Sequence, residues 1–149
     1  MTTRSALHVT IDLLSRRSYS QQQLSQKLQQ KGFDQSEISD ALDYAQQNAW
    51  LDDESYAYSL TRARLAKGYG PNYIRQYLRQ KGISNELAAK VLSDPEWDWY
   101  QALELRFSRK FKQGLPERGP LQQKCRAYLF RRGFDADLIN ILFSEQAQQ

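Results

Sequence analysis

Residues 68–82 read Gly-Tyr-Gly-Pro-Asn-Tyr-Ile-Arg-Gln-Tyr-Leu-Arg-Gln-Lys-Gly, and this stretch has the form of one short helix with a defined start and end. Gly70 permits the chain to turn, Pro71 suits the first helical position, where no N–H is needed, and Gly82 suits the left-handed residue that ends a helix. The apolar side chains between these ends recur at i, i+3 and i+4 and predict one apolar face: Ile74, Tyr77 and Leu78.

The end of this helix has two counterparts elsewhere in the chain. Leu-Arg-Gln-Lys-Gly-Ile at 78–83 is similar to Leu-Gln-Gln-Lys-Gly-Phe at 28–33 and to Leu-Phe-Arg-Arg-Gly-Phe at 129–134. The glycines of the three copies lie 50 and 51 residues apart, at Gly32, Gly82 and Gly133. A near-constant period of this length is typical of tandem repeats in which each copy is one supersecondary unit.

The repeat predicts an all-α fold, an elongated tandem array of three three-helix modules that are similar to helix-turn-helix units. We place the modules at residues 1–51, 52–94 and 95–149 of the 149-residue chain. The 7 glycines and 4 prolines stand mostly where helices would end. Units of this size are marginally stable alone, but apolar residues make up 40% of the chain and can form three small cores.

Local patterns predict where several helices begin. Ser20 precedes Gln23 by three residues, and Asp34 precedes Glu37 by three, so both pairs match a capping box. Further helices are expected to begin at capping residues outside such a box: Asp52 or Asp53, Ser84, Asp94 with Pro95 after it, and Asp135.

Apolar spacing predicts the buried face of individual helices. The third predicted helix carries its apolar stripe at Ile38, Ala41, Leu42, Ala45 and Ala49. The fourth predicted helix carries its stripe at Tyr56, Leu60 and Ala63. The basic residues of that helix are expected on its other face: Arg62 and Arg64.

The sequence does not support catalysis. The only tight carboxylate cluster is 52–54, and sequential residues at a helix start do not converge on one cation, so we interpret them as caps. Residues 68–70 lack both the Gly-x4-Gly-Lys-Ser/Thr pattern and the preceding strand of a phosphate loop. His8 has no serine or cysteine nucleophile in a recognisable elbow. We predict no catalytic residue, metal or cofactor.

Cysteine usage and hydropathy indicate the compartment. Cys125 is the single cysteine, so it cannot form an internal disulfide, and it has no metal-ligand spacing with His8. The first 20 residues contain no apolar core long enough for a signal peptide, and no stretch approaches the about 18 apolar residues of a membrane span. We therefore expect a cytoplasmic protein without membrane association.

The net charge of +4 is unevenly distributed. Residues 32–61 contain seven carboxylates and no Lys or Arg, and residues 55–85 contain six cations and no carboxylate. Residues 105–134 contain nine cations and one carboxylate, Glu117. Such blocks indicate faces of opposite sign and an extended charged partner.

Cations of the second and third modules are the predicted partner contacts. Aromatic residues are interleaved with them, as in surfaces that meet phosphates or an acidic protein groove, although most of these aromatics are better explained as core. The predicted contact residues are Arg62, Arg64, Lys67, Arg75, Arg79, Lys81, Arg106, Arg109, Lys110, Arg126, Arg131 and Arg132.

The middle module contains Trp-Leu-Asp-Asp-Glu-Ser-Tyr-Ala at 50–57, residues 62–68, Gly-Pro at 70–71, Ile74, Leu78 and Lys-Gly-Ile at 81–83. These segments resemble the RecX family of bacterial proteins, and they are the most specific part of the likeness. Arg-Arg-Gly-Phe at 131–134 extends the likeness, which runs from about Ala6 to Phe143. The chain differs in two places, with Trp50 where an aromatic of tyrosine type is usual and with a glutamine-rich short helix in the first module: Gln21, Gln22, Gln23 and Gln26.

The resemblance implies three tandem three-helix modules without catalytic activity. Proteins of this family bind in the helical groove of the RecA filament on single-stranded DNA and suppress its growth, ATP hydrolysis and strand exchange, and some also bind DNA. We therefore expect a monomeric RecA inhibitor that modulates DNA repair and recombination. The alternative is a stand-alone DNA-binding protein made of tandem helix-turn-helix-like units. The acidic block at 34–54 separates the two, because it would repel a continuous DNA track but suits a protein groove.

Overall fold

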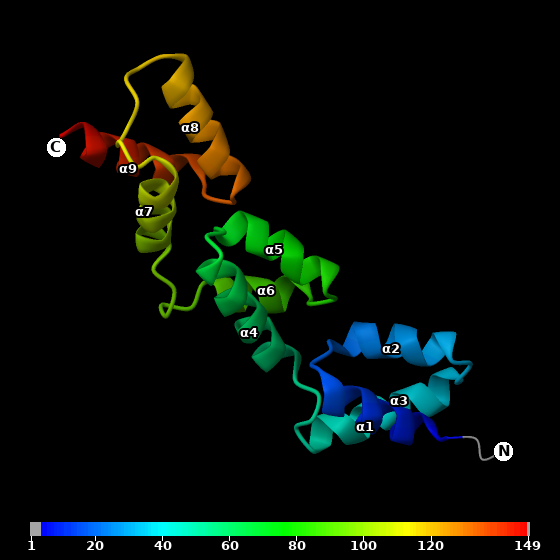
Figure 1. Ribbon diagram of the computed structural model, residues 1–149. Coiled ribbons are helices and arrows are strands. Elements are labelled where there is room, and N and C mark those ends of the chain that lie inside the picture. The colour runs from blue at the N-terminus through cyan, green and yellow to red at the C-terminus, as the bar shows by residue number, and fades with distance from the viewer. Residues whose placement is uncertain (1–3, 149) are drawn as a thin grey trace.

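The computed structural model describes residues 4–148, and within that range the chain forms nine α-helices and no strand (Figure 1). The helices are α1 (Ala6–Arg16), α2 (Gln21–Gln30), α3 (Gln35–Gln47), α4 (Asp53–Ala66), α5 (Pro71–Gln80), α6 (Asn85–Leu92), α7 (Trp99–Lys110), α8 (Pro120–Arg131) and α9 (Ala136–Ala147). The predicted all-α tandem fold is confirmed. None of the described helices has both the length and the hydropathy needed to cross a bilayer.

Each run of three consecutive helices packs around its own apolar core. We call α1–α3 unit one, α4–α6 unit two and α7–α9 unit three, and the extensive helix contacts lie within these units. The second helix of each unit places two fully buried side chains in its core at equivalent positions of the repeat: Leu24 and Leu28, Ile74 and Leu78, Cys125 and Leu129. Buried core positions therefore recur with the same spacing of about 50 residues as the sequence repeat. The exact module boundaries predicted at residues 51 and 94 stay predictions.

The three glycines of the repeat end α2, α5 and α8 in the same way. Their φ angles are 91° at Gly32, 89° at Gly82 and 104° at Gly133. The residue after each glycine donates its N–H to the carbonyl five positions earlier, at 3.2, 3.0 and 3.3 Å respectively. This pattern satisfies the last carbonyls of a helix and needs a left-handed residue. The predicted role of these glycines is confirmed.

Most predicted helix starts are confirmed, but the one at Asp94 is wrong. α7 begins at Trp99, and Asp98 is its N-cap. Asp94 lies in the preceding turn and accepts a hydrogen bond from the Tyr58 hydroxyl at 2.6 Å. The chain stays non-helical there because Trp97 is buried in the core of unit two and donates its indole N–H to a backbone carbonyl. Burying a large aromatic ring outweighs an early helix start at a proline.

Two predicted apolar faces also differ from the structure. Ala49 lies beyond the end of α3 and is exposed, with a φ of 59°. On α4 the fully buried residues are Ala57 and Thr61, whereas Ala63 is exposed. The Thr61 hydroxyl donates to the Ala57 carbonyl at 2.8 Å, so its polar group is satisfied within the helix and can be buried. Tyr56 and Leu60 of the predicted stripe do pack against the core of unit two. The hydropathy pattern therefore found the edge of the buried face and missed its centre, because it ranks threonine as polar.

The three units form an extended molecule rather than one globule (Figure 1). The chain exposes 9623 Å², compared with about 7,900 Å² for a compact monomer of this length. The excess follows from dividing the apolar side chains among three small cores.

Candidate partner-binding surface

The end of α8 docks on the start of α5 and joins unit three to unit two. The Gly70 N–H donates to the Arg132 carbonyl at 2.7 Å, and the Asn72 N–H donates to the Gly133 carbonyl at 2.9 Å. A Cβ on Gly133 would lie 2.5 Å from the backbone nitrogen of Tyr73, and a Cβ on Gly70 would lie 2.7 Å from the Gly133 carbonyl carbon. Gly70 has a φ of −98°, which any residue adopts. Close approach of two backbones, rather than the predicted turn, therefore requires glycine at this position.

The end of α5 docks on the start of α2 and joins unit two to unit one. The buried Ser20 hydroxyl donates to the Lys81 carbonyl at 2.5 Å. A Cβ on Gly82 would lie 2.7 Å from the Ser20 Oγ. The Gln21 N–H donates to the Asp53 carboxylate at 2.9 Å, which ties the start of α2 to the start of α4.

The two joints use equivalent positions of the repeat. Ser20 and Gly70 are the N-caps of α2 and α5, and Lys81 and Arg132 are the C-caps of α5 and α8. The second helices therefore follow one another along one side of the molecule, from α2 through α5 to α8 (Figure 1). Their outer faces form one extended, mainly polar surface, which we call the second-helix surface.

Two of the predicted contact cations lie inside the joint between units two and three. Arg132 donates to the carbonyls of Gly68, at 3.2 Å, and Lys67, and its guanidinium carbon lies 3.9 Å from the centre of the Tyr69 ring. Arg106 donates to the Lys67 carbonyl at 3.5 Å, and its Nε is buried without a hydrogen-bond partner among the described residues. Both guanidinium groups face the carbonyl end of α4, where the helix dipole favours cations. The sequence did not indicate this structural role.

Arg62 and Arg64 on α4 are also engaged within the chain. Arg62 pairs with Glu96 at 3.1 Å. Arg64 donates to the Tyr77 hydroxyl at 2.9 Å, and its guanidinium carbon lies 4.1 Å from the centre of the same ring. Arg62 remains exposed beside Glu96, and Arg64 is partly buried against α5, so both side chains also contact neighbours of α4 within unit two.

In unit three, two further predicted cations lie over aromatic rings. Arg126 on α8 donates to the Asn140 side chain on α9, and its guanidinium carbon lies 4.8 Å from the centre of the Phe143 ring. The Lys110 ammonium lies 5.2 Å from the centre of the Tyr128 ring. Cation–π contacts of this kind orient the side chain but leave part of its charge accessible.

The remaining predicted cations are exposed or partly exposed. They are Lys67, Arg75, Arg79, Lys81, Arg109 and Arg131. Arg75 and Arg79 lie one turn apart on α5, in the middle of the second-helix surface, and Arg75 donates to the Asn72 side chain at 2.9 Å. Side chains at this spacing are neighbours on a helix and can meet the same partner.

The acidic cluster at 52–54 does not converge on one point. Asp52 is the N-cap of α4, Asp53 accepts the Gln21 N–H, and Glu54 pairs with the Lys90 ammonium at 3.1 Å. Burial raises the pKa of Asp53, and the hydrogen bond from Gln21 opposes that rise. The interpretation of Asp52 as a cap is confirmed. Over residues 4–148, no group of His, Cys, Asp or Glu has the arrangement of a metal site.

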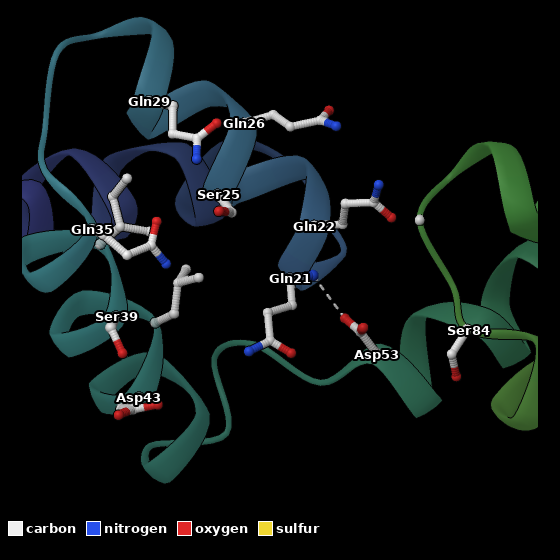
Figure 2. Close-up of a pocket in the computed structure, with 13 residues that line it drawn as sticks. Gln21, Gln22, Ser25, Gln26, Gln29, Gln35, Ser39, Asp43, Asp53 and Ser84 are labelled. Carbon is white, nitrogen blue, oxygen red and sulfur yellow. Dashed lines mark hydrogen bonds between the residues drawn. The ribbon is translucent and has the colours of Figure 1, made fainter.

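A polar cleft of about 600 Å³ lies between α2 and α3 and reaches unit two at the start of α4 and at the turn between α5 and α6 (Figure 2). Five glutamines, three serines and two aspartates line it, and no Lys or Arg does. The glutamines differ from the family pattern, and the sequence did not predict that they line a cleft. The available signal was their spacing, since Gln22 and Gln26 on α2, like Gln35 and Ser39 on α3, are four residues apart.

Comparisons with known proteins assign the family. The family model described as the first three-helix domain of RecX matches residues 6–44, and the model described as its second three-helix domain matches residues 52–92. The protein of Haemophilus influenzae named Regulatory protein RecX is 38% identical over 134 residues, which cover 89% of this chain and 88% of that protein. The chain belongs to the RecX family. The Regulatory protein RecX of Legionella pneumophila is 35% identical to this RecX-family chain, over 94% of its length and 93% of the relative.

Solved structures agree with the fold of this RecX-family chain. The crystal structure of RecX from Lactobacillus salivarius matches it with a TM-score of 0.83, over 97% of this chain and 96% of that one, at 19% identity, and so shows the fold alone. A crystal structure of a regulatory protein RecX matches with a TM-score of 0.75 and 26% identity, over 93% of this chain and 70% of that one. The predicted family is confirmed, and its named members indicate a regulatory role.

Proposed function

We propose that this RecX-family chain regulates the RecA recombinase by binding in the helical groove of the RecA filament on single-stranded DNA. It acts in the cytoplasm as a monomer and without catalysis, and its binding suppresses filament growth, ATP hydrolysis and strand exchange. DNA repair and recombination are modulated as a result. The observation that carries the proposal is the end-to-end joining of α2, α5 and α8, because it gives an extended surface suited to an extended partner.

The exposed cations of α5 are the central contact in this proposal. Arg75 and Arg79 lie on the second-helix surface, and their guanidinium groups suit carboxylates or phosphates in a groove. Charge-assisted pairs of this kind also direct association and fix its orientation. Of the twelve predicted cations, these two combine exposure with a central position on the surface.

The acidic face of unit one favours a protein groove over DNA alone. Glu37, Asp40 and Asp43 are exposed on α3. A DNA duplex or strand that followed all three units would pass these carboxylates, and like charges repel it. The partner of unit one is therefore a protein surface, and any DNA contact falls to units two and three.

Reversal of the two α5 charges tests the proposal. We expect Arg75→Glu with Arg79→Glu to weaken inhibition of the RecA ATPase on single-stranded DNA about tenfold or more, since two charge-assisted contacts are lost and replaced by repulsion. Both positions are exposed, so stability should change by about 0.5 kcal/mol or less. Inhibition should also weaken as salt rises.

A matched control separates this surface from net charge. Arg16→Glu with Lys90→Glu changes the charge equally at two exposed positions on α1 and α6, outside the second-helix surface. This control should inhibit like the parent. If the α5 variant is folded and inhibits equally well, the proposed surface is wrong. If it loses only DNA binding while filament inhibition is retained, the stand-alone DNA-binding alternative explains the α5 charges.

A further inference from the structure

The cleft of unit one is bounded by one polar stripe from each of two helices. Ser25 and Gln29 face it from α2, and Ser39 and Asp43 face it from α3 (Figure 2). The buried side chain of Leu42 contributes to its lining between these stripes, and unit two closes one end. The part of α3 that lines it, 35–43, is about 12 Å long, the length of about four residues of extended peptide.

In unit three an arginine of the chain itself occupies the corresponding place. Arg126 on α8 reaches α9, where it donates to the Asn140 side chain and lies over the Phe143 ring. The repeat offsets of 51 and 50 residues assign each of these three residues an equivalent in unit one. The equivalents all line the cleft: Ser25, Ser39 and Leu42. Unit one is therefore open at the site where unit three holds its own guanidinium group.

The chemistry of the lining selects the occupant. Glutamine amides donate and accept hydrogen bonds, so they can pair with both groups of a peptide backbone. Asp43 makes no ion pair among the described residues, and no Lys or Arg lines the cleft. Phosphates would meet carboxylates here without a compensating cation, whereas a guanidinium group would gain a charge-assisted partner.

We propose that this cleft is a docking site for an extended peptide segment that carries an arginine side chain. The guanidinium group lies over Leu42 beside Ser39, as Arg126 lies over Phe143 beside Asn140, and it pairs with Asp43. The proposal deepens the filament-binding function and rests on it for the source of the segment, which is the protein of the filament rather than its DNA.

Peptide titration followed by NMR tests the docking site without the filament. The probe is the acetylated, amidated peptide Gly-Ser-Arg-Ser-Gly, and the comparison peptide has glutamate in place of arginine. We expect the arginine peptide to shift the backbone signals of Ser39 and Asp43 and the side-chain amide signals of Gln26, and the glutamate peptide to leave them unchanged. Equal shifts with both peptides, or shifts with oligothymidylate instead, would overturn the proposal.

Two variants locate the binding within the cleft. Ser25→Arg places an arginine where unit three has Arg126, so it should fill the site and weaken peptide binding about tenfold or more, as expected for the loss of a charge-assisted contact. Gln30→Arg adds the same charge on the exposed face of α2 outside the cleft and should bind like the parent. If Ser25→Arg prevents folding, Asp43→Asn gives the same test with little change of shape, with Asp40→Asn as its control.

Filament inhibition separates this proposal from the function on which it rests. Retained inhibition with no peptide binding by the parent would overturn the docking site alone. Peptide binding by a parent chain that fails to inhibit RecA would overturn the filament function and leave the docking site standing.

Discussion

At the scale of single residues, glycine is required at Gly82 for two reasons and at Gly32 for one. Both have φ near +90°, but an added Cβ at Gly82 would meet the Ser20 Oγ at 2.7 Å, whereas nothing lies within 4 Å at Gly32. We expect Gly32→Ala to lower the free energy of unfolding by about 1 kcal/mol from backbone strain. Gly82→Ala should lower it further, because it also disturbs the joint with unit one.

Urea unfolding of the two alanine variants measures this difference. Only the Gly82 variant should also expose the amide of Gln21, which is bonded across the joint, to faster hydrogen exchange. Equal losses of stability in the two variants would mean that the joint tolerates the added methyl group.

Ala49 has a left-handed conformation that alanine adopts at a cost. It follows the end of α3, where the Trp50 N–H donates to the Ala45 carbonyl at 2.9 Å, as at the glycine-terminated helices. We expect Ala49→Gly to raise the free energy of unfolding by up to about 1 kcal/mol, since relief of strain exceeds the added entropy of the unfolded chain. The residue is exposed, so no core contact is lost. Thermal unfolding measures the gain, and a lower midpoint would contradict this explanation.

The role of a single residue could be predicted from the sequence where neighbouring residues determine it. The conformation of Gly82 follows from a pattern within six residues, but the need for glycine at Gly70 comes from Gly133, which is far away in the chain. The internal partners of Arg132 were missed for the same reason, because Gly68 and Lys67 are distant in sequence.

At the scale of helices, the contact of α8 with α5 depends on Arg132. Its guanidinium group bonds the carbonyl end of α4 and lies over Tyr69, so Arg132→Ala should loosen this joint while each unit stays folded. We expect faster hydrogen exchange at the amides of Gly70 and Asn72, which donate across the joint.

The neighbouring residue provides a control for that measurement. Arg131 is exposed, and Arg131→Ala removes the same charge without touching the carbonyls of α4. Its exchange pattern should match the parent. Similar acceleration in both variants would assign the effect to charge rather than to the Arg132 contacts.

The starts of the helices were easier to predict from the sequence than the faces that the helices bury. Capping patterns such as Asp34 with Glu37 located helix starts because the interaction spans one turn. The centre of the buried face of α4 was not found from hydropathy, because Thr61 is polar and its hydroxyl is satisfied by a bond to its own helix. The cleft between α2 and α3 likewise depends on how the two helices pack, so the spacing of polar residues on each helix could indicate a polar stripe but not the cleft.

At the scale of the whole molecule, the separate cores predict an extended particle in solution. A compact chain of this length would have a radius of gyration of about 15 Å. We expect small-angle scattering to give a clearly larger value that does not change with concentration, as for an extended monomer. A value near the compact figure would mean that the units fold back on one another.

The period of the sequence predicted the number and size of the units, because each repeat carries its own core positions. The direction of the array was not predictable, since it is set by two joints whose contacts connect residues such as Ser20 and Lys81.

The equivalence of the two joints has a geometric consequence. Ser20 meets Lys81 through its hydroxyl and Gly70 meets Arg132 through its backbone N–H, so the contacts differ in their donor but use the same repeat positions. A similar screw operation would then relate unit one to unit two and unit two to unit three. The chain is then a short arc of a superhelix with a pitch of its own, and a partner with helical symmetry can match that pitch over every unit at once. A fourth unit copied from residues 52–94 and spliced after unit two would extend the arc along the same screw axis. Each added copy would therefore lengthen the surface available to the partner by the same distance.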